Sequence, residues 1–395
     1  MLDKANFDFD QIIPRRNTNC AKWDEMDEKY GLKDLIHLGV ADMDFQSPPA
    51  VRSALQKVVE HGVFGYTNLG EGFYSSIQRW MKKQFNCDIP KEWIVFCPRI
   101  NIASSICVEK LTNPHDKIII NTPAYAPLEN AVLKNHRTVV ESPLLLKNGR
   151  YQMDFDQLEK IVDESTKMFV LCNPHNPTGR IFDKEELWRL ADFCDRHQLY
   201  LFSDEIHSDI IKKGHRHACT LSLPQQLQNR LIYANSVTKT MNIPGLIISY
   251  MIIPNEHLRT QISQDIERVG ILNPNIFSIA ALEAGYTQSD DWLEAVNDYI
   301  DQNEKLFRDF VEANMPKFHV LPREGTYLLW VDCKEFGLPQ EKLEEWFLHS
   351  AKVSVYMGTI FGKRGEGYIR VNLATARPLL RQALLRMREV YGEIS

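Results

Sequence analysis

The chain has 395 residues and a formal net charge of −6, with 44% hydrophobic and 25% charged residues. This balance is typical of a folded globular protein and argues against a disordered or fibrous chain. Because the net charge is negative and the basic residues are scattered, the sequence also argues against a nucleic-acid partner.

The start of the chain and the spacing of its cysteines indicate in which cellular compartment the protein is found. The opening MLDKANFDFDQ lacks the basic and apolar regions of a secretory signal, and no apolar run approaches the roughly eighteen residues of a membrane span. The eight cysteines are spread without a CxxC pair, and several lie in apolar runs, which favours buried, reduced thiols. The sequence therefore predicts a cytoplasmic protein that does not contact a membrane.

Between residues 93 and 253, short apolar runs alternate with amphipathic helical patterns. Six runs have the length and the continuous apolar character of strands that are buried on both faces. They are WIVFC (93–97), KIIIN (117–121), KMFVLC (167–172), LYLFSDE (199–205), RLIYANS (230–236) and LIISYMII (246–253). Helical periodicity lies between most of them, as in 184–197. This alternation predicts an α/β fold with a mainly parallel, doubly wound sheet.

The C-terminal part of the chain has a different order of elements. They are a long helix near 291–314, a strand at TYLLWVD (326–332) and a closing helix from about residue 377. We expect a smaller α/β domain, built from residues 285–395 together with the N-terminal segment 1–45. A large domain would then span 46–284. Since the sequence has no Gly/Ser linker, the two domains should pack together.

Polar loops lie at the ends of three predicted strands, where an open α/β sheet binds its ligands. They are NPHNPTG (173–179), SDEIH (203–207) and SVTKT (236–240). A loop rich in Asn-Pro pairs is, by itself, most often only a rigid turn. In this order and spacing, however, the three loops resemble the motifs of fold type I enzymes that depend on pyridoxal 5′-phosphate (PLP), the aspartate aminotransferase superfamily.

Further stretches resemble one branch of that superfamily, the MalY/PatB group of cystathionine β-lyases and cystalysins. They are GVADMDF (39–45), FGYT (64–67), TPAYAP (122–127), KTMNIPGL (239–246), EGTYLLWVD (324–332) and IRVNLA (369–374). The resemblance covers nearly the whole chain. It implies a seven-stranded sheet in the large domain, PLP as the cofactor, an amino acid as the substrate, and a homodimer with shared active sites.

Three residues would hold the reactive part of the cofactor. Lys239 matches the lysine that binds PLP covalently. Its predicted place at the end of an apolar strand can lower the pKa of its amine, which would not happen for a surface lysine. Asp204, at the end of a neighbouring strand, would keep the pyridine nitrogen protonated by Coulomb attraction. Because side chains alternate along a strand, Glu205 should point away and Ile206 should return to pack against the ring.

Three more residues would surround the ring of the cofactor. Tyr125 matches the tyrosine that stacks on the other face of the pyridine, although a tyrosine of the core is the alternative. Asn176 matches a donor to the phenolic oxygen. His207 lies where some relatives place a tyrosine for the same oxygen, and a histidine of the core is again the alternative.

The phosphate should be bound at the start of a helix that follows WIVFC, by backbone N–H groups and hydroxyls. The resemblance assigns these contacts to Ile100, Asn101, Ser236 and Tyr66 of the partner subunit. Many aminotransferases also bind the phosphate with an arginine eight residues after the lysine, where this chain has Ile247. Arg99 could supply the missing positive charge, or only its backbone could matter, with the guanidinium directed to solvent or to the substrate entrance.

Substrate recognition is expected at the other end of the chain. Arg370, between the apolar Ile369 and Val371, matches the arginine that binds an α-carboxylate through two parallel hydrogen bonds. The backbone around Gly39, Val40 and Ala41 should close over the substrate.

The sequence offers no metal site. His215 and His217 form only an HxH pair, without a cysteine or carboxylate at ligand spacing.

Three functions remain open at this point. One is a carbon–sulfur β-lyase, in which Lys239 removes the α-proton and a thiolate leaves Cβ, giving pyruvate, ammonia and a thiol. The second is an aminotransferase, because the motifs around the cofactor suit both reactions. The third is a non-catalytic regulatory protein that binds PLP, against which the intact set of site residues argues. Only the branch resemblance favours the lyase.

Overall fold

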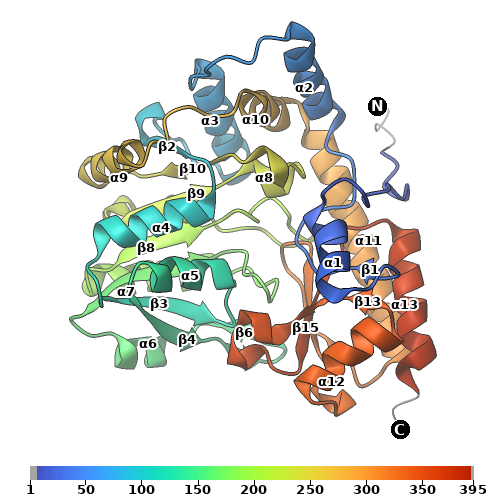
Figure 1. Cartoon of the computed structure of the whole chain (residues 1–395). Helices are drawn as coiled ribbons and strands as arrows, with labels where there is room; N and C mark the ends of the chain where they lie inside the picture. The colour runs from blue at the N-terminus through green and yellow to red at the C-terminus, as the bar shows by residue number, and fades with distance from the viewer. Residues whose placement is uncertain (1–6, 393–395) are drawn as a thin grey trace.

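A seven-stranded sheet lies at the centre of the protein in this computed structural model, which describes residues 7–392 (Figure 1). In spatial order the strands are β2 (Ile94–Cys97), β10 (Ser249–Ile252), β9 (Leu231–Asn235), β8 (Tyr200–Asp204), β7 (Thr166–Cys172), β3 (Lys117–Thr122) and β4 (Thr138–Pro143). Strand β10 runs antiparallel to both neighbours, and the other pairs are parallel. The predicted mainly parallel α/β sheet is confirmed.

Helices cover both faces of this sheet, because its strands are apolar on both sides. One face carries α4 (Ile100–Leu111), α5 (Ala126–Lys134) and α9 (Glu256–Arg268). The other carries α3 (Glu71–Phe85), α7 (Lys184–Arg196) and α10 (Ile276–Gln288), with α2 (Pro49–His61) packed on α10. Within β3, Ile118 and Ile120 belong to the first of these cores and Ile119 to the second, as alternation along a strand requires.

A second, antiparallel sheet is formed by the C-terminal part of the chain. Its strands, in order, are β11 (His319–Val320), β12 (Leu328–Asp332), β15 (Tyr368–Asn372) and β14 (Tyr356–Met357). The helices of this part are α11 (Asp290–Asn314), α12 (Gln340–Glu345) and α13 (Arg377–Tyr391). These elements match the predicted long helix, strand and closing helix.

The N-terminal segment lies beside this second sheet. Strand β1 (Ile36–His37) pairs in parallel with β13 (Val353–Ser354), and α1 (Met26–Tyr30) precedes it. The remaining named elements are the hairpin β5 (Leu145–Lys147) and β6 (Arg150–Gln152) and the short helices α6 (Phe155–Ile161) and α8 (Val237–Thr240). The division into 1–45 with 285–395 and 46–284 stays a prediction, and its residues 1–6 and 393–395 lie outside the described residues.

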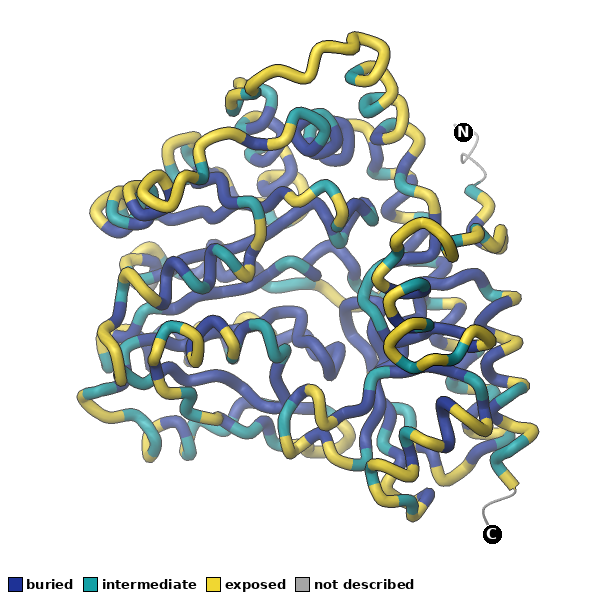
Figure 2. The backbone as a smooth tube through the Cα atoms, in the orientation of Figure 1, coloured by how far each residue is buried: buried dark blue, intermediate teal, exposed yellow. Residues whose placement is uncertain are grey.

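Figure 2 shows which parts of this architecture are shielded from solvent. The central strands are buried, whereas the connection between α2 and α3, residues 62–70, is mostly exposed. Within residues 7–392, none of the helices combines the length and the apolar character that crossing a membrane would require. Seven of the eight free cysteines are buried and Cys20 is half-buried.

Candidate active site

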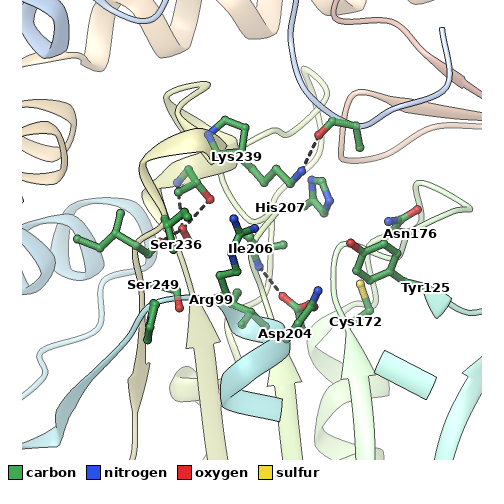
Figure 3. A pocket seen from close by; sticks show the side chains of 18 residues that line it. Arg99, Tyr125, Cys172, Asn176, Asp204, Ile206, His207, Ser236, Lys239 and Ser249 are labelled. Carbon is green, nitrogen blue, oxygen red and sulfur yellow. Dashed lines mark hydrogen bonds between the residues drawn. The ribbon is translucent and has the colours of Figure 1, made fainter. Parts of the chain in front are cut away.

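A cavity lies at the carboxyl edge of the central sheet, where the loops after β2, β3, β7, β8 and β9 meet (Figure 3). Ten of the residues predicted for the cofactor line it: Arg99, Ile100, Asn101, Tyr125, Asn176, Asp204, Ile206, His207, Ser236 and Lys239. In Figure 3, Ser236 and Ser249 lie on one side of the cavity, and Tyr125 and Asn176 on the opposite side. Parallel strands bring these loops together although they are far apart in sequence.

Lys239 lies on the short helix α8 rather than at the end of a strand. The hydroxyl of Ser236 caps this helix by accepting a hydrogen bond from the N–H of Thr238 at 3.1 Å. The Lys239 amine reaches into the cavity and donates to the carbonyl oxygen of Ala41 at 2.5 Å (Figure 3). Burial lowers the pKa of this amine to about 8. An amine with this pKa is largely neutral just above pH 8, so it can act as a nucleophile or as a base.

Asp204 is the last residue of β8 and is only 4% exposed. One carboxylate oxygen accepts a hydrogen bond from the backbone N–H of Ile206 at 3.1 Å. Burial raises the pKa of Asp204 to about 7. Among the described residues no cationic side chain forms an ion pair with Asp204, so the carboxylate is suited to a cationic partner that enters the cavity. Glu205 is directed elsewhere, as alternation predicts, and it bonds with Thr220.

Arg370 does not itself line the cavity. It is connected to the cavity through Asn176, which is one of the lining residues. The guanidinium donates to the side-chain oxygen of Asn176 at 2.8 Å and to the carbonyl of Gly39 at 2.9 Å. It lies between the rings of Tyr356 and Phe361, with its central carbon 4.9 and 4.8 Å from their centroids. Burial lowers the pKa of Arg370 to about 10, and its Nε–H is buried without a hydrogen-bond partner. A donor in this state would be satisfied by an added anion.

His207 is buried and Tyr125 is half-buried. Burial holds the pKa of His207 well below its ordinary value, and nearby Lys239 and Arg370 lower it further. The neutral ring has its Nδ1 buried without a hydrogen-bond partner. This unpaired atom favours a role toward a ligand over that of a satisfied histidine of the core. Burial also raises the pKa of Tyr125, so its hydroxyl stays protonated.

The helix that starts beside the cavity is α4, and Arg99 is its N-cap. Ile100 and Asn101 therefore lie in its first turn, where backbone N–H groups lack partners within the helix. The Arg99 side chain lines the cavity and adds to the lowering of the Lys239 pKa, after the larger effect of burial. Tyr66 lies outside the cavity, 98% exposed on the connection between α2 and α3.

Several cavity residues were not predicted from sequence. They are Pro98, Cys172, Thr238, Pro244, Ile247, Ile248 and Ser249. Ala41, whose backbone was expected to close over the substrate, lines the cavity as well. A buried tyrosine next to the cavity was missed too: Tyr327 donates its hydroxyl to Ala41 at 2.8 Å, and its ring contacts His207. Ala41 and Tyr327 lie in the motifs GVADMDF and EGTYLLWVD, which resemble those of the family. The motifs did not indicate, however, that these two residues contact each other.

The chain matches known proteins along most of its length. Residues 33–386 match the family described as aminotransferase class I and II. Cystathionine beta-lyase PatB of Bacillus subtilis is 35% identical, over 96% of this chain and 98% of PatB. Protein MalY of Escherichia coli is 30% identical, over 96% of this chain and 97% of MalY. The solved structure of cystalysin from Treponema denticola, which contains PLP, has a TM-score of 0.96 at 33% identity and covers 99% of this chain and 100% of cystalysin.

Proposed function

Because this chain belongs to the aminotransferase class I and II family, in the branch of PatB and MalY, we propose that it is a PLP-dependent carbon–sulfur β-lyase. Its substrate would be a sulfur-containing amino acid, and its products pyruvate, ammonia and a thiol. The meeting of an amine of lowered pKa on Lys239, a buried carboxylate on Asp204 and an under-satisfied guanidinium on Arg370 supports PLP chemistry on an amino acid. The observation that favours the lyase over an aminotransferase is the 35% identity to cystathionine beta-lyase PatB over 96% of this chain.

The polar groups that line the site fit PLP, and the buried Nδ1 of His207 has no hydrogen-bond partner of its own. Asp204 would face the ring nitrogen, Asn176 and His207 the phenolic oxygen, and Tyr125 and Ile206 the two faces of the ring. The first turn of α4 together with Ser236 would hold the phosphate. When bound, PLP withdraws electrons from the α-carbon of an attached amino acid, which makes its proton acidic.

Arg370 would bind the α-carboxylate of the substrate. Two of its nitrogens already donate to Asn176 and Gly39, which fixes the plane of the guanidinium before substrate arrives. The unpaired Nε–H and the remaining hydrogens can then form a charge-assisted pair with a carboxylate. The backbone at Gly39 and Val40 would lie over the substrate, because Arg370 and Asn372 hold their carbonyls.

Lys239 would both bind the cofactor and move the proton. Its amine, once free and neutral, accepts the proton from the α-carbon. Loss of a thiolate from Cβ follows, and hydrolysis with one water gives pyruvate and ammonia. Since burial lowers the amine's pKa to about 8, its neutral form is available near physiological pH.

We infer that the enzyme is a homodimer with shared sites. Exposed apolar side chains gather near the connection between α2 and α3: Val63 and Phe64 lie on it, Phe64 contacts Phe277, and Leu272 is 65% exposed. Burying such a patch against a second copy would remove it from water. Tyr66 on the same connection would then bind the phosphate in the partner's site.

A mixing experiment tests the shared site. Tyr66→Ala and Lys239→Ala, each nearly inactive alone, should regain activity when unfolded and refolded together, because a hybrid dimer has one intact site. The absence of any recovery, or a monomer in analytical ultracentrifugation, would exclude this assembly.

We also infer a cytoplasmic location, which the buried and free cysteines support.

The reaction itself is tested with purified protein, PLP and L-cystathionine, with pyruvate and thiol as the readout. The same protein is then given an amino acid and 2-oxoglutarate. We expect pyruvate without any need for a keto acid. Amino-group transfer to 2-oxoglutarate without pyruvate from any thioether would make the protein an aminotransferase, the reaction for which its family is named.

A further inference from the structure

The carbonyl oxygen of Ala41 accepts two side-chain donors at once. The Lys239 amine lies 2.5 Å from it, and the Tyr327 hydroxyl 2.8 Å. A carbonyl oxygen has two lone pairs, so both donors can bind in good geometry. The two donors come from residues 198 and 286 positions away from Ala41, on separate parts of the fold.

The peptide that carries this oxygen is held from both sides. The side-chain amide of Asn372 donates to the carbonyls of Val40 at 2.7 Å and Asp42 at 2.6 Å. Asn372 lies on β15, two residues after Arg370. These contacts fix the residues that flank Ala41, and the Tyr327 hydroxyl fixes the direction of the Ala41 carbonyl itself. The oxygen is therefore a rigid acceptor at the wall of the cavity.

We propose that Tyr327 is a positioning residue, whose hydroxyl holds the Ala41 carbonyl as the acceptor that orients the Lys239 amine while that amine is free. The idea rests on the proposed function, in which the free amine takes a proton from the α-carbon. A neutral amine has two N–H donors and one lone pair. Donation of one hydrogen to a fixed carbonyl restricts rotation about the terminal bond, so the lone pair stays directed into the cavity.

The hydroxyl of Tyr327 also bears on the charge state of Lys239. A carbonyl oxygen that already accepts one hydrogen bond attracts a second donor less strongly, and the loss is greater for an ammonium than for a neutral amine. The Tyr327 hydroxyl therefore disfavours the charged form of Lys239. Burial raises the pKa of Tyr327, so the hydroxyl remains protonated and a donor over the working pH range. The other titratable and charged groups that act on Lys239 are Asp42, Asp204, Arg99, Arg370 and His207. Replacing a neutral hydroxyl by hydrogen leaves all of them in place.

The first test uses the holoenzyme with Tyr327→Phe, which keeps the ring beside His207 and removes only the hydroxyl. We expect kcat to fall about five- to tenfold, the effect of one lost hydrogen bond, with KM changed less than about threefold because the Arg370 contacts are intact. The acid limb of the pH profile should move up by about half a unit to one unit, since the ammonium form is no longer disfavoured.

Tyr286→Phe is the matched control. Tyr286 is also fully buried and bonds through its hydroxyl, to Tyr250 at 3.1 Å, but it lies outside the cavity. A buried tyrosine with a merely structural role should alter thermal stability and leave the pH profile unmoved. If Tyr327→Phe and Tyr286→Phe have the same pH profile and the same kcat as the unsubstituted enzyme, the positioning role is wrong.

A second test needs neither cofactor nor turnover. The full chain is freed of PLP and labelled with acetic anhydride across a pH series, and the extent of labelling at Lys239 is measured by peptide mass spectrometry. The labelling midpoint should be higher in Tyr327→Phe by the same half to one unit, and unchanged in Tyr286→Phe. An unchanged midpoint in Tyr327→Phe overturns the inference. A raised midpoint in a protein that forms no pyruvate would support the positioning of Lys239 and reject the lyase.

Discussion

Replacement of Asp204 by asparagine should stabilise the cofactor-free fold, although it should damage the enzyme. Burial raises the pKa of this carboxyl from the ordinary value of 3.8 to about 7. The folded chain thus binds this proton more tightly than the unfolded chain does. The resulting destabilisation is absent below about pH 4, grows as the pH rises and is complete above about pH 7.

The size of the effect follows from the shift in pKa. Three pKa units correspond to about 4 kcal/mol, so at pH 8.5 Asp204→Asn should raise the free energy of unfolding by about that amount. At pH 5, where the unfolded carboxyl is ionised and the folded one is not, the gain should be about 2 kcal/mol. Asparagine retains the side-chain oxygen that accepts from Ile206, so this hydrogen bond survives.

Urea denaturation of the PLP-free chain at pH 5 and pH 8.5 measures this difference. Asp332→Asn is a matched control, because Asp332 accepts a hydrogen bond from Lys334 across the same two-residue spacing but is partly exposed. Its substitution should leave stability nearly unchanged at both pH values. If Asp204→Asn is no more stable than the parent chain at pH 8.5, the buried carboxylate does not destabilise the fold. With PLP bound, the same variant should lose kcat strongly, with a smaller change in KM, because the ring nitrogen has lost its counter-charge.

Three further substitutions test the roles of the cationic residues. Lys239→Ala should still bind PLP but lose nearly all turnover, and borohydride should fix the cofactor of the unsubstituted protein on the peptide that contains Lys239; a label on another lysine would contradict the assignment. Arg370→Lys keeps the positive charge but loses the pair of parallel hydrogen bonds that a guanidinium can donate to a carboxylate, so KM should rise at least tenfold. An unchanged KM would mean that the substrate carboxylate binds elsewhere. Arg99→Gly should weaken PLP binding by about ten- to a hundredfold if its guanidinium holds the phosphate, whereas an unchanged dissociation constant would leave only backbone and hydroxyl contacts.

The strands that could be predicted from sequence are the ones buried on both faces. β3 and β7 differ from their predicted ranges by one residue at one end, and β9 by one residue at each end, because continuous apolar runs determine them. Strand β4 was not predicted, because it lies at the edge of the sheet and most of its residues, Thr138–Pro143, are half-buried or exposed. A half-exposed segment lacks the apolar run on which the other predictions were based.

The site was predictable where local motifs carry the chemistry. Asp204 ends an apolar strand, Asn176 lies in the polar loop after another, and Lys239 lies on the short helix that follows a third. The parallel sheet brings these segments together. The contact that Lys239 makes with a backbone carbonyl was not predictable in this way. The Ala41 carbonyl receives Lys239 and Tyr327, but no side-chain pattern identifies a carbonyl as an acceptor, and only the tertiary fold brings the three residues together.

The segment that carries Ala41 is itself held in place by a buried group of charges. Asp44 accepts from Lys22 at 2.6 Å, from Arg15 at 2.7 Å and from the indole of Trp23 at 3.1 Å. Burial alone would raise the pKa of Asp44, but Lys22 and Arg15 hold it below the ordinary value, so the carboxylate stays ionised. A buried ion pair of this kind gains little net stability, because both charges lose water, yet removing one partner leaves the other charge unpaired at a cost of several kcal/mol. Such an arrangement tolerates few alternative positions, which explains how the N-terminal segment, whose strand β1 pairs with β13 over two residues, can carry an acceptor for the amine of Lys239.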